Sequence, residues 1–141
     1  MEDQYEKFKK EFIKTKIRNQ RALESQKFGD FILQSNNIQF YLSQLVILRA
    51  SFPDKEYVEK IESGTLGQII NLFCACCKTE TGEHTLIPKL RSHNKIRNKF
   101  AHKVLITTIP TNNELKKSIE LGNDILKALI LIANKELQSR K

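Results

Sequence analysis

Apolar residues recur at steps of three and four over almost the whole chain, and this period constrains the fold more than any other feature. Near the start the pattern runs through Tyr5, Phe8, Phe12 and Ile13. Residues 115–137 repeat it near the end. Because this spacing is that of one face of an amphipathic helix, the sequence predicts an all-α protein.

Turn and cap signals divide the first half of the pattern. Gly29 predicts a break in the first helical stretch, before a largely buried segment, Phe31–Ala50. Pro53 suits the first turn of a short helix, because its missing N–H is not needed there. The pair Ser63–Gly64 is a typical helix stop.

Two capping boxes mark helix starts in the second half. Thr65 with Gln68 opens a helix expected to reach about Lys78, and Thr111 with Glu114 opens the last helix. Between them the polar stretch TETGEHT, residues 79–85, predicts a loop.

A further helix is expected over LIPKLRSHNKIRNKFAHKV, residues 86–104, with Pro88 in its first turn. LITTIP, residues 105–110, predicts an extended connector. We therefore expect a single domain, 1–141, built as an antiparallel bundle of four main helices plus a short one, because short loops favour antiparallel neighbours.

Composition narrows the class of protein. The chain has 141 residues and a net charge of +8, and its longest apolar cluster, ILKALILIA, is shorter than the ~18 residues of a membrane span. The start, MEDQYEKFKKEF, has no signal-peptide core. We expect a cytoplasmic protein with no membrane partner, and the positive charge gives mild support to an RNA or DNA partner.

Cysteine and glycine patterns argue against other chemistries. Cys74, Cys76 and Cys77 are too few and too closely spaced for a metal site, so we expect small buried side chains plus one exposed thiol. The five glycines form no phosphate-binding loop, which disfavours a nucleotide-dependent enzyme.

The stretch RNKFAH, residues 97–102, concentrates reactive side chains in a plain helical sequence. On a helical wheel Leu86, Leu90, Phe100 and Val104 form one stripe, with Arg97 in its middle and His93 beside it. His102 shares a face with Asn98 but lies ~140° from Arg97. The two can meet if the helix bends or ends nearby, if the arginine reaches around, or if two copies join across a two-fold axis.

These residue types suit RNA cleavage. Histidine can act as acid or base near neutral pH, and arginine offers a fork of donors that fits phosphate oxygens. RNA supplies its own nucleophile, the 2′-OH, so we expect no metal and no cofactor. Lys95, Lys99 and Lys103 surround the motif and could hold the RNA backbone.

Structural roles are open for the same residues. Arg97 could pair with a carboxylate such as Glu62, and His102 could cap a helix end. His84 and His93 are lone histidines, for which surface or packing roles are expected.

The motif RNKFAH resembles the R-x4-6-H signature of the HEPN superfamily, with Arg97, Asn98 and His102 in the matching order and spacing. The helical bundle and the helix start TLGQII, residues 65–70, are also similar to small members of that family.

The resemblance implies a homodimeric, metal-independent endoribonuclease that leaves 2′,3′-cyclic phosphate ends. In it His102 would transfer protons, Arg97 would bind the scissile phosphate and Asn98 would orient the site. It also implies a toxin or phage-defence effector with an antitoxin or regulatory partner. The alternatives are a catalytically inactive HEPN-like dimer that serves as an interaction module, and a plain nucleic-acid binder supported only by charge.

Overall fold

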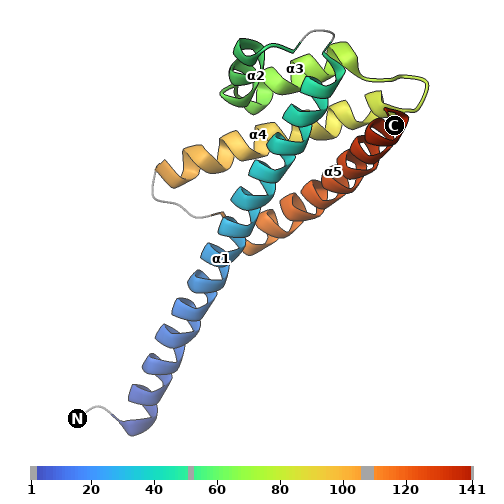
Figure 1. Cartoon of the computed structure of the whole chain (residues 1–141). Coiled ribbons are helices and arrows are strands. Elements are labelled where there is room, and N and C mark those ends of the chain that lie inside the picture. Colours follow the sequence, from blue (N-terminus) through green and yellow to red (C-terminus); the bar gives the residue numbers. More distant parts are fainter. Residues whose placement is uncertain (1–2, 51–52, 106–109, 141) are drawn as a thin grey trace.

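The computed structural model describes residues 3–50, 53–105 and 110–140, together with their side chains except at 20–25 and 103–105. Over these residues every regular element is a helix, which confirms the predicted all-α class (Figure 1). Within the same residues, no helix combines the length and apolar character that crossing a bilayer requires.

The helices follow one another with short connections. Their bounds are α1 Gln4–Arg49, α2 Lys55–Glu62, α3 Leu66–Cys76, the 3-10 turn η1 Glu83–Thr85, α4 Leu86–Leu105 and α5 Asn112–Ser139. The turn η1 lies in the segment predicted to be a loop. Residues 106–109 of the predicted extended connector lie outside the described residues.

The predicted break at Gly29 is wrong, because α1 runs through it as one helix of 46 residues. A glycine inside a helix costs only about 1 kcal/mol. On either side of it, the rings of Phe28 and Phe31 pack against Phe100, with centroids 6.5 and 5.1 Å apart. Packing of this kind outweighs the glycine's preference.

Both predicted capping boxes are confirmed, whereas Pro53 lies one residue before Asp54, the N-cap of α2, and not in the first turn of that helix. The Thr65 hydroxyl accepts from the backbone N–H of Gln68 at 3.2 Å, and the Gln68 side chain accepts from the N–H of Thr65 at 3.0 Å. Thr111 and Glu114 form the second capping box in the same way. Each box satisfies backbone donors that a helix start leaves unpaired.

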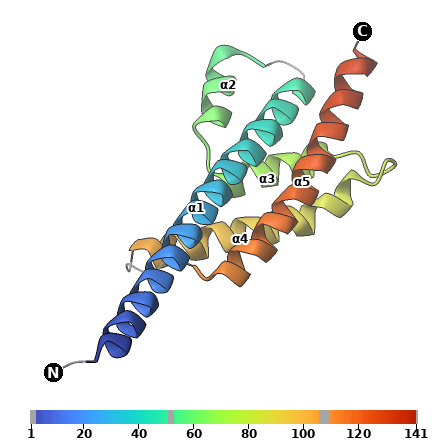
Figure 2. The ribbon, with the colours of Figure 1, turned by 90° about the horizontal axis from the view of Figure 1, so that it is seen from below.

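The packing of α1 against α5 is parallel, not antiparallel as expected. Lys27 bonds to Asn112, Gln34 to the carbonyl of Ile119, and Arg49 to Glu136, so both helices advance together. Figure 2 shows the two helices side by side with α4 crossing them. The antiparallel rule applies to neighbours joined by short loops, whereas three α-helices separate α1 from α5 in the chain. The rule does hold for α3 and α4. Asn71 lies near Arg91, and Gly67, earlier in α3, lies near Asn94, later in α4, so these two helices are antiparallel.

Two apolar clusters hold the helices together. The larger cluster contains side chains from all five α-helices, and Leu42, Ile70 and Leu129 are among its buried members. The smaller consists of Phe31, Phe100 and Leu115, and fixes α4 on α1 and α5. The three cysteines, 74, 76 and 77, are free and all half-buried, so the expected single exposed thiol is wrong.

A buried ionic cluster closes the end of the bundle far from the N-terminus. Arg49, from the end of α1, donates to both carboxylate oxygens of Glu83 at 2.6 and 2.9 Å and to Glu136 at 3.3 Å. The side chains of these three residues, which we name the Arg49 cluster, are 6 to 8% exposed. Lys78 and Arg140 bond to Glu136 from the rim.

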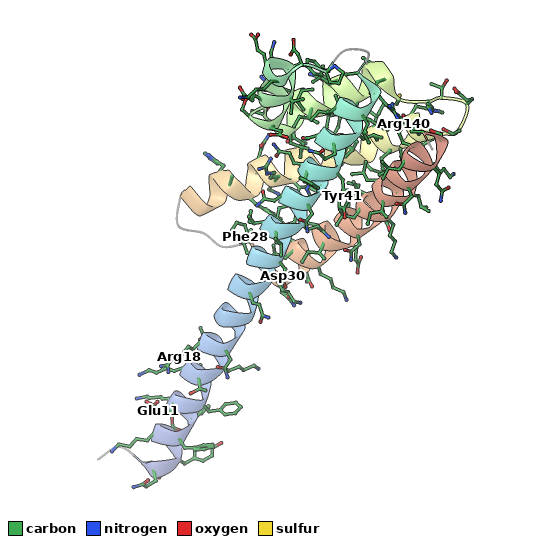
Figure 3. All side chains as sticks on the ribbon, in the orientation of Figure 1. Glu11, Arg18, Phe28, Asp30, Tyr41 and Arg140 are labelled. Carbon is green, nitrogen blue, oxygen red and sulfur yellow. The ribbon has the colours of Figure 1, made fainter. Side chains whose placement is uncertain are left out.

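The first part of α1 projects from the bundle as the N-terminal arm, residues 4–19, all of whose side chains are exposed (Figure 3). Glu11 and Arg18 lie on this arm, and Phe28 lies where α1 meets the other helices. The arm exposes large apolar side chains: Tyr5, Phe8, Phe12, Ile13 and Ile17.

Candidate functional site

Helix α4, which crosses α1, carries the RNKFAH motif (Figure 2). Leu86, Leu90 and Phe100 are buried, which confirms the stripe predicted to face the core. The side chain of Val104, the fourth member, lies outside the described residues. The helix continues to Leu105, so it does not end between Arg97 and His102.

Arg97 is half-buried between α4 and α1. Its Nη1 donates to the side-chain oxygen of Gln39 at 3.2 Å, and the Gln39 amide nitrogen donates to the carbonyl of Gly64 at 2.9 Å. This short chain of hydrogen bonds connects the arginine to the turn before α3. Gln39 is a neutral partner, so it orients the guanidinium without neutralising its charge.

Arg97 lines two cavities. One, of about 500 Å³, lies on the α1 side and is lined by Asn36, Gln39, Phe40, Ser43, Gln44, Glu62 and Arg97. The other, of about 590 Å³, lies towards α3 and is lined by Gln39, Gly64, Thr65, Leu66, Gly67, Asn94, Arg97, Asn98 and Ala101. Arg97 and Gln39 line both cavities, so the two spaces share these residues.

The structure brings only part of the predicted set together. Arg97 and Asn98 line the same cavity. His102 is exposed one turn beyond Asn98 and is not among the residues lining either cavity. Lys95 and Lys99 are exposed on α4, and the side chain of Lys103 lies outside the described residues.

His93 is a packing residue, as expected. It is fully buried, its Nε2 lies 2.9 Å from the hydroxyl of Ser35, and its ring lies 5.2 Å from that of Phe31. Burial, together with the positive charge of Arg97, lowers the pKa of His93 to about 4. The ring is therefore neutral at physiological pH, and it lies one turn from Arg97 without adding a second charge. His84, by contrast, is exposed.

Sequence reasoning missed the contribution of α1 to this region. Gln39 and Phe40 lie in the segment expected to be buried on one side, and neither has a local pattern that marks a site. Their role depends on α4 crossing α1 at this point. The sequence signal near Phe40 was a set of polar residues in a largely apolar segment: Asn36, Gln39 and Gln44.

Comparison of the chain with protein-family models, with curated proteins and with solved structures gives no match. The resemblance to the HEPN superfamily therefore rests on the sequence motif, residues 97–102.

Proposed function

We propose that this chain is a metal-independent endoribonuclease of the HEPN type that acts as a homodimer. The observation that carries the proposal is the position of Arg97, a half-buried residue that is oriented by Gln39 and lines two cavities. A phosphate bound beside Arg97 would meet a planar fork of N–H donors.

The continuous course of α4 supports the dimer. Arg97 and His102 lie about 140° apart around a straight helix, and α4 extends beyond both residues. A second copy related by a two-fold axis would bring two Arg97 and two His102 side chains, one of each from either copy, into a single groove.

The reaction follows from the residue types. A base, here a His102, takes the proton of the 2′-OH, and the 2′-oxygen attacks the adjacent phosphorus. The P–O5′ bond breaks, and the second His102 returns a proton to the 5′-oxygen. The products carry a 2′,3′-cyclic phosphate and a 5′-OH. Arg97 stabilises the charge that builds on the phosphoryl oxygens, which is usually the largest catalytic term, and Asn98 orients the site.

Cleavage of end-labelled, mixed-sequence RNA in EDTA tests the proposal. We expect wild-type protein to cut and to leave cyclic phosphate ends, and His102→Ala to lose at least about a hundredfold in rate, the usual contribution of a general acid or base. His84→Ala, which removes another exposed histidine outside the site, is the matched control and should keep the wild-type rate.

Folding measurements separate loss of chemistry from loss of structure. Because His102 is exposed, His102→Ala should melt close to wild type. The proposal fails if wild type leaves the RNA intact, or if His102→Ala and His84→Ala cut equally well.

In this proposal the chain works as a toxin or a phage-defence effector, and an antitoxin or regulatory protein restrains it. The resemblance to the HEPN superfamily supports this setting. Co-expression of a neighbouring gene that relieves growth arrest by wild type, but is not needed with His102→Ala, would support it.

A second candidate function is a catalytically inactive helical interaction module. The apolar side chains of the N-terminal arm favour it, because Phe8 is 68% and Phe12 60% exposed. Exposed apolar patches of this kind mark protein–protein or membrane contacts. Under this candidate, deleting residues 1–19 abolishes complex formation, whereas His102→Ala leaves the cellular effect unchanged.

A further inference from the structure

The cavity on the α1 side of Arg97, which we name the Phe40 cavity, combines one aromatic ring with several carboxamides. Its volume of about 500 Å³ lies within the range of small-ligand sites. The amino acids around it are, besides Arg97, Asn36, Gln39, Phe40, Ser43, Gln44 and Glu62. The HEPN signature accounts for Arg97 alone among these residues.

The ring of Phe40 is 59% exposed although it lines this cavity. It contacts Tyr41 edge-on, with ring centroids 5.8 Å apart and planes at 74°, and Tyr41 is itself half-buried against the core. Single exposed apolar residues are common on protein surfaces. The distinguishing feature here is that the ring borders the same space as the Arg97 guanidinium.

The carboxamides supply the complementary polar groups. Asn36, Phe40 and Gln44 are spaced four apart on α1, so they follow one another along a single helix face. Each carboxamide offers both donors and acceptors. Those are the groups that bond the edges of an unpaired base, whereas an aromatic side chain stacks on its face.

We propose that the Phe40 cavity binds an unpaired nucleobase of RNA, stacked on Phe40, next to a phosphate held by Arg97. The inference rests on the RNA substrate of the proposed function and narrows it to single-stranded RNA. A base inside a duplex is stacked and paired with its partners, so it cannot enter.

Binding of fluorescein-labelled oligoribonucleotides, followed by anisotropy, tests this assignment. The probes carry 2′-fluoro sugars, so that no nucleophile is present, and are compared as a single strand and as a duplex. Phe40→Leu keeps an apolar side chain but removes the aromatic face, and Phe40→Trp restores one. Leu33→Ala is the matched control, since Leu33 is 61% exposed on the same side of α1, two turns away, and is not among the lining residues.

We expect Phe40→Leu to weaken single-strand binding about tenfold, the loss of one base–aromatic stack. Phe40→Trp and Leu33→Ala should stay within about twofold of wild type, and duplex binding should not change with Phe40→Leu. The inference is overturned if wild type binds no single strand, if Phe40→Leu binds it as wild type does, or if both probes weaken equally.

Cleavage assays on the same variants keep the two proposals apart. If wild type binds the single strand through Phe40 but never cleaves RNA, the nuclease proposal fails and the base site stands. If wild type cleaves RNA and Phe40→Leu changes neither binding nor rate, the base site fails and the nuclease proposal stands.

Discussion

Replacing Glu83 with glutamine should destabilise the fold strongly, because it breaks the Arg49 cluster. Glu83 is 8% exposed, and both of its oxygens accept hydrogen bonds from Arg49. Glutamine keeps the shape but loses the charge and one acceptor. Removing one partner of a buried ion pair costs about 3–5 kcal/mol. Since Glu136 remains 3.3 Å from Arg49, we expect the lower end, about 3 kcal/mol.

Thermal melting followed by circular dichroism at pH 7 measures this loss. The entropy of unfolding, about 2.1 cal/mol/K per residue, amounts to about 0.3 kcal/mol/K for a chain of this length. A loss of 3 kcal/mol then lowers Tm by about 10 °C. Glu80→Gln is the matched control, because Glu80 is an exposed glutamate of the same loop and should melt as wild type does.

The pH dependence of the Tm difference between wild type and Glu83→Gln provides a second, independent test. Burial raises the pKa of Glu83, but hydrogen bonds from Arg49 and from the backbone of Lys78, with the charge of Arg49, outweigh it and lower the pKa overall. The unfolded state then binds the proton first, so this stabilisation is present above about pH 4.5 and is lost as the pH falls through the folded-state pKa. The Tm gap between wild type and Glu83→Gln should therefore shrink in acid. A gap under about 2 °C at neutral pH, or one equally large at pH 3, would refute the reasoning.

Three further predictions concern the packing of α1. Gly122→Ala should cost about 1–3 kcal/mol, because its Cβ would collide with the buried side chain of Gln34, and a urea titration would measure the loss. Gly29→Ala should stabilise by about 1 kcal/mol in the same assay, because it adds a helix-forming residue where nothing lies within 4 Å of the new Cβ. Lowering the pH from 7.5 to 5 should cost about 2 kcal/mol through His93, since its pKa of about 4 lets the unfolded state bind a proton first, and His93→Gln should lose this dependence.

Gly29→Ala and Gly122→Ala serve as controls for each other, since both substitutions add the same methyl group to a helix. Equal effects at both positions would contradict the packing derived for Gln34. For His93, an unchanged acid dependence in His93→Gln would assign the titration to other groups.

Most of the helix boundaries could be predicted because their causes are local. A capping box needs only four consecutive residues, as at Thr65–Gln68, and the apolar period of a helix can be read within one short stretch of sequence. The prediction of a helix break at Gly29 was wrong because the deciding interaction is not local. The effect of Gly29 on the backbone is local, whereas the packing of Phe28 and Phe31 on α4 that overrides it comes from a distant segment.

The site was only partly predictable for the same reason. The motif residues Arg97 and Asn98 stand out in one short stretch, but the partner of Arg97 is Gln39, 58 residues earlier in the chain. The Arg49 cluster joins residues 34 and 87 positions apart, and charged residues at such distances give no recognisable pattern in a single sequence. Contacts between α1 and the other helices had to come from the structure.

The length of α1 sets the outer dimension of the molecule. At 1.5 Å per residue its 46 residues span about 69 Å, whereas a compact chain of this size has a radius of gyration of only about 14 Å. Small-angle X-ray scattering of the isolated chain should thus record an elongated particle. The C-terminal end of α5 lies beside the end of α1 that is far from the N-terminal arm. Labels on Tyr5 and Arg140 would therefore mark the two ends of the molecule, and the distance between them would report the position of the N-terminal arm. Bending of the arm onto the bundle would shorten that distance, whereas a partner that clasps the straight arm would leave it unchanged and add mass at one end.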